Sequence, residues 1–331
     1  MGVYHFMGLG RSPGAVSAAI SYLADRCQRY KDSDARFFSG SGEAAQAGRR
    51  GDIQGLVLFT TPEVINGARE GRCLDYLDNC GGGMRTRRPG GEPMSSVLNR
   101  VLPPLLRRLD GGRGEVELYW CEIDLADPFL TFERAARALH AARPPGEVGK
   151  EIWMNLTGGG NVVNLSLQLA AALLGHPARV YYTYMRSEDI ACLHHTVPQA
   201  DLGTERDHFW VEIPVIYLGL DAAAVAILQE LETLGGPVDD QDLLGLLKSG
   251  AYWQEFQNLD LQGLRRNYLL PMRGNRLIVL TSGNNVALGQ SWSVLKRYCE
   301  IVADLQHQNS GAETNLGALA NSQSWFHGGA I

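Results

Sequence analysis

Hydrophobic residues in the first 218 positions of the chain follow two alternating patterns. Short apolar runs, typical of buried strands, occur at residues 3–7, 53–59, 116–123, 151–156 and 179–185. Longer segments with apolar residues at helical spacing lie between or after them, at residues 15–30, 94–109, 128–142 and 160–174. Strands that alternate with helices predict an α/β fold with a Rossmann-like, mostly parallel sheet.

The pattern changes near residue 218, after two more expected strands at 190–197 and 209–217. Helices are expected at 220–234, 239–247 and 259–270, then a hairpin at 277–288 and a last helix at 292–305. This order is typical of a winged helix-turn-helix. We therefore predict a ligand-binding domain over 1–218 and a winged-helix domain over 219–307. Residues 308–331, rich in Gly, Ala, Ser and Asn, are expected to be a poorly ordered tail.

Charge and composition narrow the classes of function. The chain has 331 residues and a net charge of −6, so no general attraction to nucleic acid or acidic membranes is expected. Residues 219–310 carry seven Lys or Arg and ten Asp or Glu, although Arg265, Arg266, Arg273 and Arg276 are close in sequence. The longest apolar stretch, near 165–175, is too short to span a membrane, and residues 1–10 show no secretory signal. A cytoplasmic protein is expected.

Several chemistries lack their sequence signatures. The six cysteines form no Cys-x-x-Cys pair, and Cys192-Leu-His194-His195 is a weak metal-like cluster, so no metal site is expected. No Walker A motif and no Gly-x-Ser-x-Gly elbow occur. Pro13 stands where a dinucleotide fingerprint needs its third glycine, which disfavours an NAD enzyme. Residues 70–93 are rich in Gly and Arg and are expected to form a surface loop.

Two glycine-rich turns carry the candidate chemistry. Gly8, Gly10 and Gly14 follow the first expected strand, and Gly158, Gly159 and Gly160 follow the fourth. Each turn leads into a helix, whose N-terminal N–H groups suit phosphate. The bland alternative is a tight turn without a ligand. The second helix also has an amide stripe of Asn161, Asn164 and Gln168, which suits a ligand, a partner helix or solvent.

These turns resemble the paired motifs of the CRISPR-associated Rossmann-fold (CARF) domain. The resemblance rests on Gly8-Leu-Gly-Arg-Ser-Pro-Gly14, on Asn155-Leu-Thr-Gly-Gly159 and, less specifically, on Thr60-Thr61-Pro62-Glu63. It covers roughly residues 1–218. With a winged helix and no further domain, the chain looks like the stand-alone CARF proteins of type III CRISPR systems. These include ring nucleases, which degrade cyclic oligoadenylate messengers, and transcriptional regulators.

The resemblance implies a homodimer that binds cyclic tetra- or hexa-adenylate across its two-fold axis. The ligand contacts would come from Gly8, Gly10, Arg11, Ser12, Pro13, Thr60, Thr61, Thr157, Gly158, Gly159, Gly160 and Asn161. Cleavage in the family needs no metal or cofactor, because the ribose 2′-OH attacks its own phosphodiester and leaves a 2′,3′-cyclic phosphate. Ser12 and Arg11 would be the catalytic residues here.

One departure concerns charge. Family members often carry a Lys where this chain has Asn161, and an amide cannot neutralise a phosphate. Arg11, Arg186 or an arginine of residues 85–88 could take its place. A HEPN ribonuclease motif is not evident, since Arg297 and His307 lie too far apart. The sequence thus favours a ring nuclease. The alternative is a cyclic-oligoadenylate-responsive regulator that binds DNA through the winged helix.

Overall fold

The computed structural model describes two compact units. The described residues are 2–30, 53–74, 77–78, 86–87, 92–110, 116–142, 150–177, 179–183, 210–215, 217–218, 220–307 and 315–330. The first unit comprises Met1–Ala171, His176–Val215 and Glu313–Ile331, and the second comprises Ala172–Gly175 and Ile216–Ala312. The expected strand at 190–197, the Cys192–His195 cluster, Arg186, Arg85 and Arg88 lie outside the described residues.

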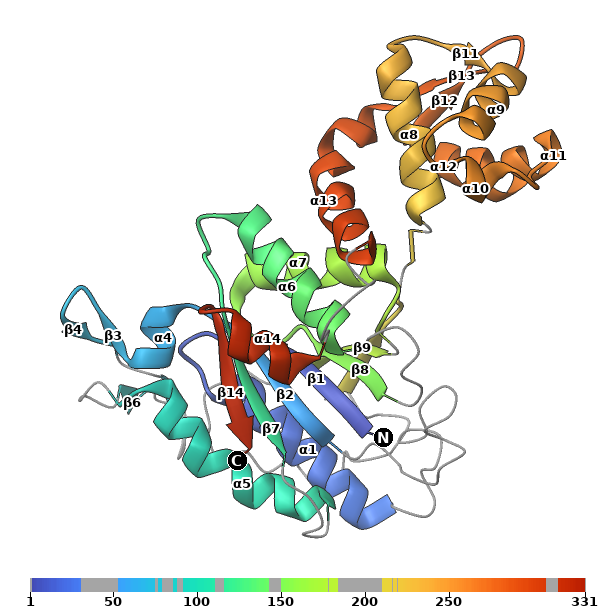
Figure 1. Cartoon of the computed structure of the whole chain (residues 1–331). Coiled ribbons are helices and arrows are strands. Elements are labelled where there is room, and N and C mark those ends of the chain that lie inside the picture. Colours follow the sequence, from blue (N-terminus) through green and yellow to red (C-terminus); the bar gives the residue numbers. More distant parts are fainter. Residues whose placement is uncertain are drawn as a thin grey trace. The chain divides into compact units, whose positions relative to one another are not determined.

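A seven-stranded sheet forms the centre of the first unit (Figure 1). Its order is β10-β9-β8-β1-β2-β7-β14. The five inner strands run parallel, and the two edge strands are antiparallel to their neighbours. The prediction of a Rossmann-like, mostly parallel sheet is therefore confirmed. The inner strands are β1 (Gly2–Gly8), β2 (Ile53–Thr60), β7 (Glu117–Glu122), β8 (Lys150–Asn155) and β9 (Arg179–Thr183); the edge strands are β10 (Trp210–Ile213) and β14 (Phe326–Ala330).

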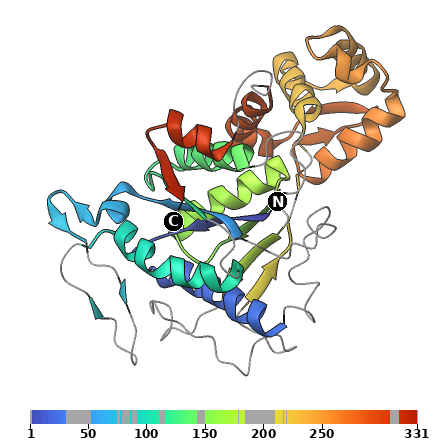
Figure 2. The same cartoon turned by 60° about the horizontal axis from the view of Figure 1, so that its bottom comes forward.

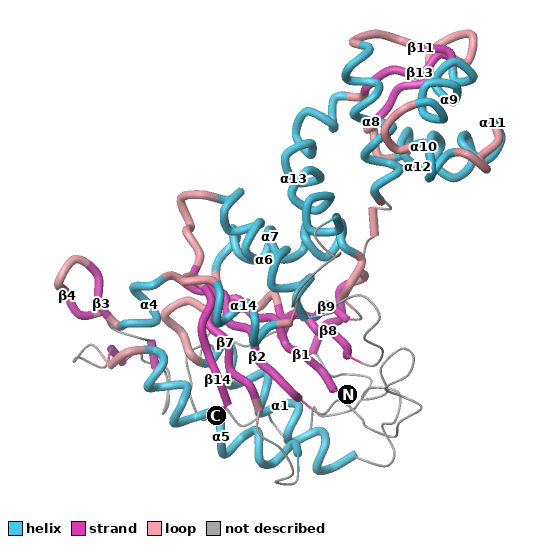
Figure 3. Tube along the Cα trace, in the orientation of Figure 1, coloured by secondary structure: helices cyan, strands magenta, loops and turns pink. Residues whose placement is uncertain are grey.

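Helices cover both faces of this sheet (Figures 2 and 3). One face carries α1 (Gly14–Tyr30) and α5 (Met94–Asp110), and the other carries α6 (Pro128–Ala142) and α7 (Gly160–Leu174). The change of face follows from connection handedness. The chain moves from β1 outward to β2 and β7, then returns to the other side of β1 for β8 and β9. Right-handed crossovers in opposite directions place their helices on opposite faces.

The apolar periodicity of the sequence matches the observed burial. On the α1 and α5 face the core includes Val16, Leu23, Leu98 and Leu102, all buried against strand residues such as Met7. The apolar rows of each helix face the sheet, and the sheet buries both of its own faces, as expected for parallel strands. Among the described residues, no helix is long and apolar enough to cross a bilayer.

The prediction of a poorly ordered tail is wrong for residues 315–330. These residues form α14 (Leu316–Ser322) and β14, which pairs antiparallel with β7 from Phe326↔Cys121 to Ala330↔Glu117. Phe326 is fully buried and stacks on Tyr119 with ring centroids 5.3 Å apart. Its burial and the ladder hydrogen bonds offset the low strand propensity of the neighbouring glycines.

Short strands occur within residues 70–93, the segment that is expected to form a surface loop. A short helix α4 (Pro62–Asn66) ends at Gly67 in the left-handed conformation and leads into a two-stranded hairpin. The hairpin is formed by β3 (Ala68–Arg69) and β4 (Arg72–Cys73). A second small pair joins β5 (Leu77–Asp78) to β6 (Thr86–Arg87).

The second unit has the expected order of helices followed by a hairpin and a helix. A small three-stranded sheet has the order β11-β13-β12. The described elements are α8 (Ala222–Leu234), β11 (Val238–Asp239), α9 (Asp240–Ser249), α10 (Trp253–Phe256), α11 (Leu261–Leu264), the π-helical turn η1 (Arg265–Leu269), α12 (Leu270–Gly274), β12 (Ile278–Leu280), β13 (Asn285–Leu288) and α13 (Gln290–His307).

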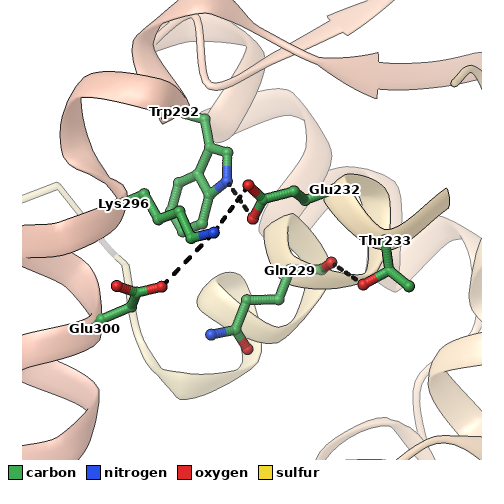
Figure 4. A network of polar contacts seen from close by, with 6 residues as sticks. All are labelled: Gln229, Glu232, Thr233, Trp292, Lys296 and Glu300. Atoms are coloured by element: carbon green, nitrogen blue, oxygen red, sulfur yellow. Dashed lines mark hydrogen bonds and ion pairs between the residues drawn. The ribbon is translucent and has the colours of Figure 1, made fainter. Parts of the chain in front are cut away.

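A polar network joins the first and last helices of this unit (Figure 4). Glu232 of α8 accepts hydrogen bonds from the indole of Trp292, at 3.4 Å, and from Lys296 of α13, at 2.9 Å. The hydrogen bond from Lys296 is the main reason that the pKa of Glu232 lies below its usual value. Because Glu232 is exposed, this network orients the helices and adds little stability.

Candidate functional site

The two glycine turns meet at the topological switch point of the sheet. Strand β1 lies between β2 and β8, and the chain leaves β1 toward one side and later returns on the other. In open α/β sheets, ligands bind beyond the carboxyl ends of the strands at such a point. The turn after β1 and the turn after β8 both lie there, because the two strands are parallel neighbours with Met7 opposite Asn155.

The two turns are in backbone contact. A Cβ atom built on Gly8 would lie 2.5 Å from the carbonyl oxygen of Gly158, and one on Gly158 would lie 2.3 Å from that of Gly8. A Cβ atom built on Gly159, which has φ of +83°, would lie 2.5 Å from the Gly8 Cα. No side chain fits at these three positions. The glycines of both turns thus allow one turn to pack directly on the other.

Gly10 and Gly160 have a different environment. Apart from the glycine itself and its neighbours in the chain, no heavy atom of the described residues lies within 4 Å of a Cβ built on either residue. Gly160 is exposed and has φ of +77°, which favours glycine on conformational grounds alone. Open space remains above these two positions, on either side of the packed glycines.

A hydrogen-bond network fixes the second turn. Asn155 at the end of β8 donates from its amide to the carbonyl of Ala15, at 3.4 Å, and accepts from the Thr157 N–H, at 2.8 Å. The Thr157 hydroxyl also bonds the Asn155 oxygen, accepts from the Thr183 N–H at 2.9 Å and lies 2.7 Å from the Thr183 hydroxyl. These three contacts use the one donor and two acceptor sites of a hydroxyl. Thr157 therefore holds β8 against β9, and its hydroxyl has no capacity left for a ligand.

The three amide side chains of the α7 stripe, Asn161, Asn164 and Gln168, differ in their environments. Asn164 donates to the carbonyl of Leu156 at 2.8 Å and so ties the first turn of the helix back to the end of β8. Asn161 is exposed, and Gln168 is half-buried. Of the three amides, Asn161 is the one placed at the open end of the turn.

The two helix N-termini differ in how their N–H groups are used. At α1, the carbonyls of Ser12 and Pro13 accept from the N–H groups of Ala15, Val16 and Ser17. Among the described residues, no comparable bond joins a first-turn N–H group of α7 to a preceding carbonyl. The first N–H groups of a helix have no partner within it, and they carry the positive end of its dipole. The N-terminus of α7 is consequently the better anion site of the two.

The other predicted residues of the first turn lie as follows. Arg11 is exposed, Gly10 and Ser12 are half-buried, and Pro13 is buried at the start of α1. The Leu9 N–H donates to the carbonyl of Phe59, at 2.9 Å, which ties this turn to the end of β2. Arg11 and Ser12 thus remain accessible beside the packed glycines.

The third motif lies at the end of β2. Thr60 is buried, and its carbonyl accepts from the N–H of Ile123. Thr61 precedes α4 in an extended conformation, and a hydrogen bond from its side chain is the main cause of the lowered pKa of Glu63. The Thr61 side chain therefore has a structural partner, whereas the buried Thr60 hydroxyl has no hydrogen-bond partner among the described residues. The predicted role of both threonines as ligand contacts stays a prediction.

A buried aromatic layer supports the site from below. His5 of β1 is fully buried, lies opposite Trp153 of β8, and has its Nδ1 3.0 Å from the Tyr181 hydroxyl. Desolvation, helped by the charge of Arg179, lowers the pKa of His5 to about 3. His5 is hence neutral at physiological pH. Tyr181 stacks on Trp210 of the edge strand with centroids 3.7 Å apart.

Sequence reasoning missed the residues that organise the turn. Asn155 belongs to the second motif, but its hydrogen bond to the carbonyl of Ala15 links residues 140 apart in the sequence and leaves no local pattern. Thr183 lies in a strand whose apolar pattern gave no hint of a bond to Thr157. In the described ranges, no group of three or more His, Cys, Asp or Glu is placed to hold a metal ion.

No family model matches the chain. An uncharacterized protein from Archaeoglobus fulgidus is 26% identical over 255 residues, which cover 71% of this chain and 74% of that protein. The structure of Enterococcus italicus Csm6 bound to cyclic hexa-2′-fluoro-hexa-dAMP aligns at 10% identity with a TM-score of 0.37. That alignment covers 93% of this chain and 64% of Csm6, so this chain spans less than two-thirds of that protein. A likeness of this size is too weak to establish a shared ligand.

Proposed function

We propose that the chain is a CARF-type protein that binds a cyclic oligoadenylate and cleaves it without a metal. The observation that carries the proposal is the backbone contact between Gly8 and Gly158 at the switch point. It joins the two motifs on which the CARF resemblance rests into one surface, with open space at Gly10 and Gly160. A phosphate at the α7 N-terminus would receive backbone N–H groups and the favourable end of the helix dipole.

The proposed cleavage depends more on the positioning of the reacting ribose and phosphate than on a strong base. The 2′-OH of one ribose attacks the adjacent phosphorus, the bond to the 5′-oxygen breaks, and a 2′,3′-cyclic phosphate remains. The ribose must be held so that the attacking and leaving oxygens are in line. N–H groups of the α7 turn would stabilise the charge of the phosphorane, and Arg11 and Ser12 would contact the same phosphate or ribose from the other turn.

A homodimer is part of this proposal. Leu165 of α7 is 66% exposed and lies one helical turn beyond Asn161. An exposed leucine beside the turn favours an isologous contact through α7, which would bring two copies of the site to one ring. Leu165→Asp should give monomers in sedimentation velocity at micromolar concentration. If the variant remains a dimer, the interface does not include Leu165 and must lie on another surface.

The cleavage assay decides the enzyme claim. Pure protein is incubated with cyclic tetra- or hexa-adenylate in EDTA, and the products are separated by chromatography. We expect linear products ending in a 2′,3′-cyclic phosphate. Ser12→Ala should slow cleavage by roughly a hundredfold to a thousandfold and change affinity less. Rings that remain intact with enzyme in molar excess would refute the nuclease.

Asn161→Lys offers a complementary test, in which the rate of cleavage should increase. Asn161 is exposed at the open end of the turn, so a lysine there fits and supplies the positive charge that the family places at this point. If missing charge limits the reaction, the variant should cleave faster than the natural chain. Asn161→Gln is the matched control, because it changes size without charge.

A second candidate function rests on the second unit. The segment from α11 to α12 presents Arg266 and Arg273 on an exposed surface, and Arg276 follows before β12. Arg265 is held by an ion pair with the buried Asp240 and is not available in the same way. A ligand-controlled regulator would use this surface on DNA. Fluorescence anisotropy with promoter DNA at low salt, with and without cyclic oligoadenylate, tests this regulator function. An affinity for DNA that is the same with and without the ligand would argue against it.

A further inference from the structure

The hairpin after α4 places two arginines directly opposite each other. Arg69 of β3 pairs with Arg72 of β4 in the antiparallel register. Residues opposite each other in such a pair point to the same face, with Cβ atoms roughly 5 Å apart. Both arginines are exposed. Like charges in this arrangement repel each other, so the pair is unfavourable unless an anion lies between them.

The neighbouring described residues do not compensate this charge. Neither guanidinium forms an ion pair or a hydrogen bond with them. The charge of Arg69 contributes to the lowered pKa of Glu63, but hydrogen bonds from Thr61 and the backbone contribute more. As far as the described residues are concerned, two positive charges on one face thus remain open to an external anion.

The turn that joins the arginines is itself unusual. Glu70 has φ of +49° and Gly71 has φ of +75°, and positive φ at both central residues is typical of the type I′ turn of a two-residue hairpin. Glycine suits this turn, as does asparagine, but glutamate rarely adopts a left-handed conformation. The tight turn keeps the two arginines paired. The hairpin is held at its base by a hydrogen bond of 2.7 Å from the Leu74 N–H to the Gly67 carbonyl.

Position in the fold relates the hairpin to the candidate site. Strand β2 is the parallel neighbour of β1, and α4 begins two residues after β2 ends. The hairpin therefore follows from the same carboxyl edge of the sheet as the glycine turns, and it projects beyond α4 (Figure 1). Planar guanidinium groups are well suited to phosphate, which they can bind through two hydrogen bonds each.

We propose that Arg69 and Arg72 form a phosphate clamp for the oligonucleotide bound at the glycine turns. This inference rests on the proposed function and adds a charged contact that the CARF motifs do not contain. It also supplies positive charge that Asn161 lacks. The clamp binds one phosphodiester group by charge and shape and does not take part in bond cleavage.

The test measures binding of uncleavable rings to the full chain. Cyclic tetra- and hexa-adenylates with 2′-fluoro groups lack the attacking hydroxyl, so their affinity is measured without turnover. Affinities are determined by calorimetry over a range of salt concentrations for the natural chain, Arg69→Ala/Arg72→Ala and Arg69→Lys/Arg72→Lys. Arg107→Ala/Arg137→Ala is the control. It removes the same charge from α5 and α6, and Arg107 lies at the opposite end of the sheet.

We expect the alanine pair to weaken binding about tenfold at low salt. The slope of log Kd against log salt should fall by about 0.7, the loss of one phosphate contact to a single strand. The lysine pair should keep the slope and lose part of the affinity, because lysine retains charge without the planar fork. Glu70→Asn should bind more tightly than the natural chain, since it removes an acid and favours the turn.

Two failures can be told apart. If the natural chain binds neither ring, the proposed function is refuted together with the clamp. If it binds a ring and the alanine pair matches the Arg107→Ala/Arg137→Ala control in affinity and salt slope, the clamp alone is refuted.

Discussion

Replacing Gly8 by alanine tests whether the two glycine turns pack as described. The added methyl group would lie 2.5 Å from the carbonyl oxygen of Gly158 and 3.0 Å from the Cα of Gly159. Both neighbours are backbone atoms, so neither can rotate away as a flexible side chain would. Either β1 and β8 separate or the second turn shifts.

The expected loss of stability is that of an overpacked core. Such insertions destabilise a protein by about 1–3 kcal/mol. For a unit of this size, that corresponds to a fall in melting temperature of roughly 2–12 °C. Because the displaced segment contains the α7 N-terminus, affinity for a cyclic oligoadenylate should fall as well.

Two other glycines of the same turns provide the controls. Gly10→Ala adds the same methyl group where no atom lies within 4 Å, and Gly10 is outside the left-handed region. It should change stability by less than about 1 kcal/mol, with a slight gain possible from the unfolded state. Gly160→Ala also meets open space but has φ of +77°, so its loss of about 1–2 kcal/mol would come from the backbone alone.

Thermal and urea unfolding followed by circular dichroism measure these changes. The predicted order of stability is Gly10→Ala above Gly160→Ala, with Gly8→Ala equal to or below Gly160→Ala. If Gly8→Ala unfolds at the same temperature and urea concentration as Gly10→Ala, the turns do not touch as described. The single surface on which the proposed function rests would then be lost.

Three further predictions concern the scaffold. The pKa of buried His5 is lowered to about 3, so stability should be complete above pH 6.5 and fall as pH drops toward 3. In urea unfolding, the free energy of unfolding should be about 2 kcal/mol lower at pH 5 than at pH 7, and His5→Gln should largely remove this difference. The same pH dependence in His5→Gln and in the natural chain would contradict the burial of His5. Phe326→Ala, which removes the ring stacked on Tyr119, should destabilise the first unit by about 3–5 kcal/mol, whereas a poorly ordered tail would show no effect. Lys296→Met should change unfolding by less than about 1 kcal/mol, because its ion pair with Glu232 is exposed, and a larger loss would mean that the pair is shielded from water.

The parts of the fold that sequence reasoning predicted are those with a local signal. Helix α6 begins at Pro128, and Asp127 just before it caps the helix by accepting from the Leu130 N–H at 3.0 Å. Apolar periodicity then continues to Ala142, where the helix ends. Strand β14 has no such signal, because its Gly328 and Gly329 are poor strand formers. Its structure comes from pairing with β7, roughly two hundred residues away, and only tertiary contacts could reveal it.

The candidate site divides in the same way. Gly158 and Gly159 predicted a turn after a strand, and the strand order placed that turn beside Gly8. The sequence could not show that the Thr157 hydroxyl is fully used by Asn155 and Thr183. That result depends on one bond to Asn155 within the turn and on two bonds to Thr183 of the neighbouring parallel strand β9. The sequence motif therefore predicts where the site lies. Whether each hydroxyl or N–H group there can bind a ligand depends on the tertiary contacts that it makes.

The distribution of charge suggests how binding and cleavage could be separated in this protein. The α7 turn offers N–H groups and about half a unit of positive charge from the helix dipole, without a cationic side chain at Asn161. Each phosphate of a cyclic oligoadenylate carries a full negative charge, and the chain as a whole has a net charge of −6. In the described part of the chain, the exposed arginines at this edge of the sheet that would attract the ring include Arg11, Arg69 and Arg72. The charges of Arg69 and Arg72 would raise affinity without stabilising the phosphorane, because they would interact equally with the ground state and the transition state. A chain built this way would bind its ligand well and cleave it slowly, and Asn161→Lys should raise the rate more than the affinity.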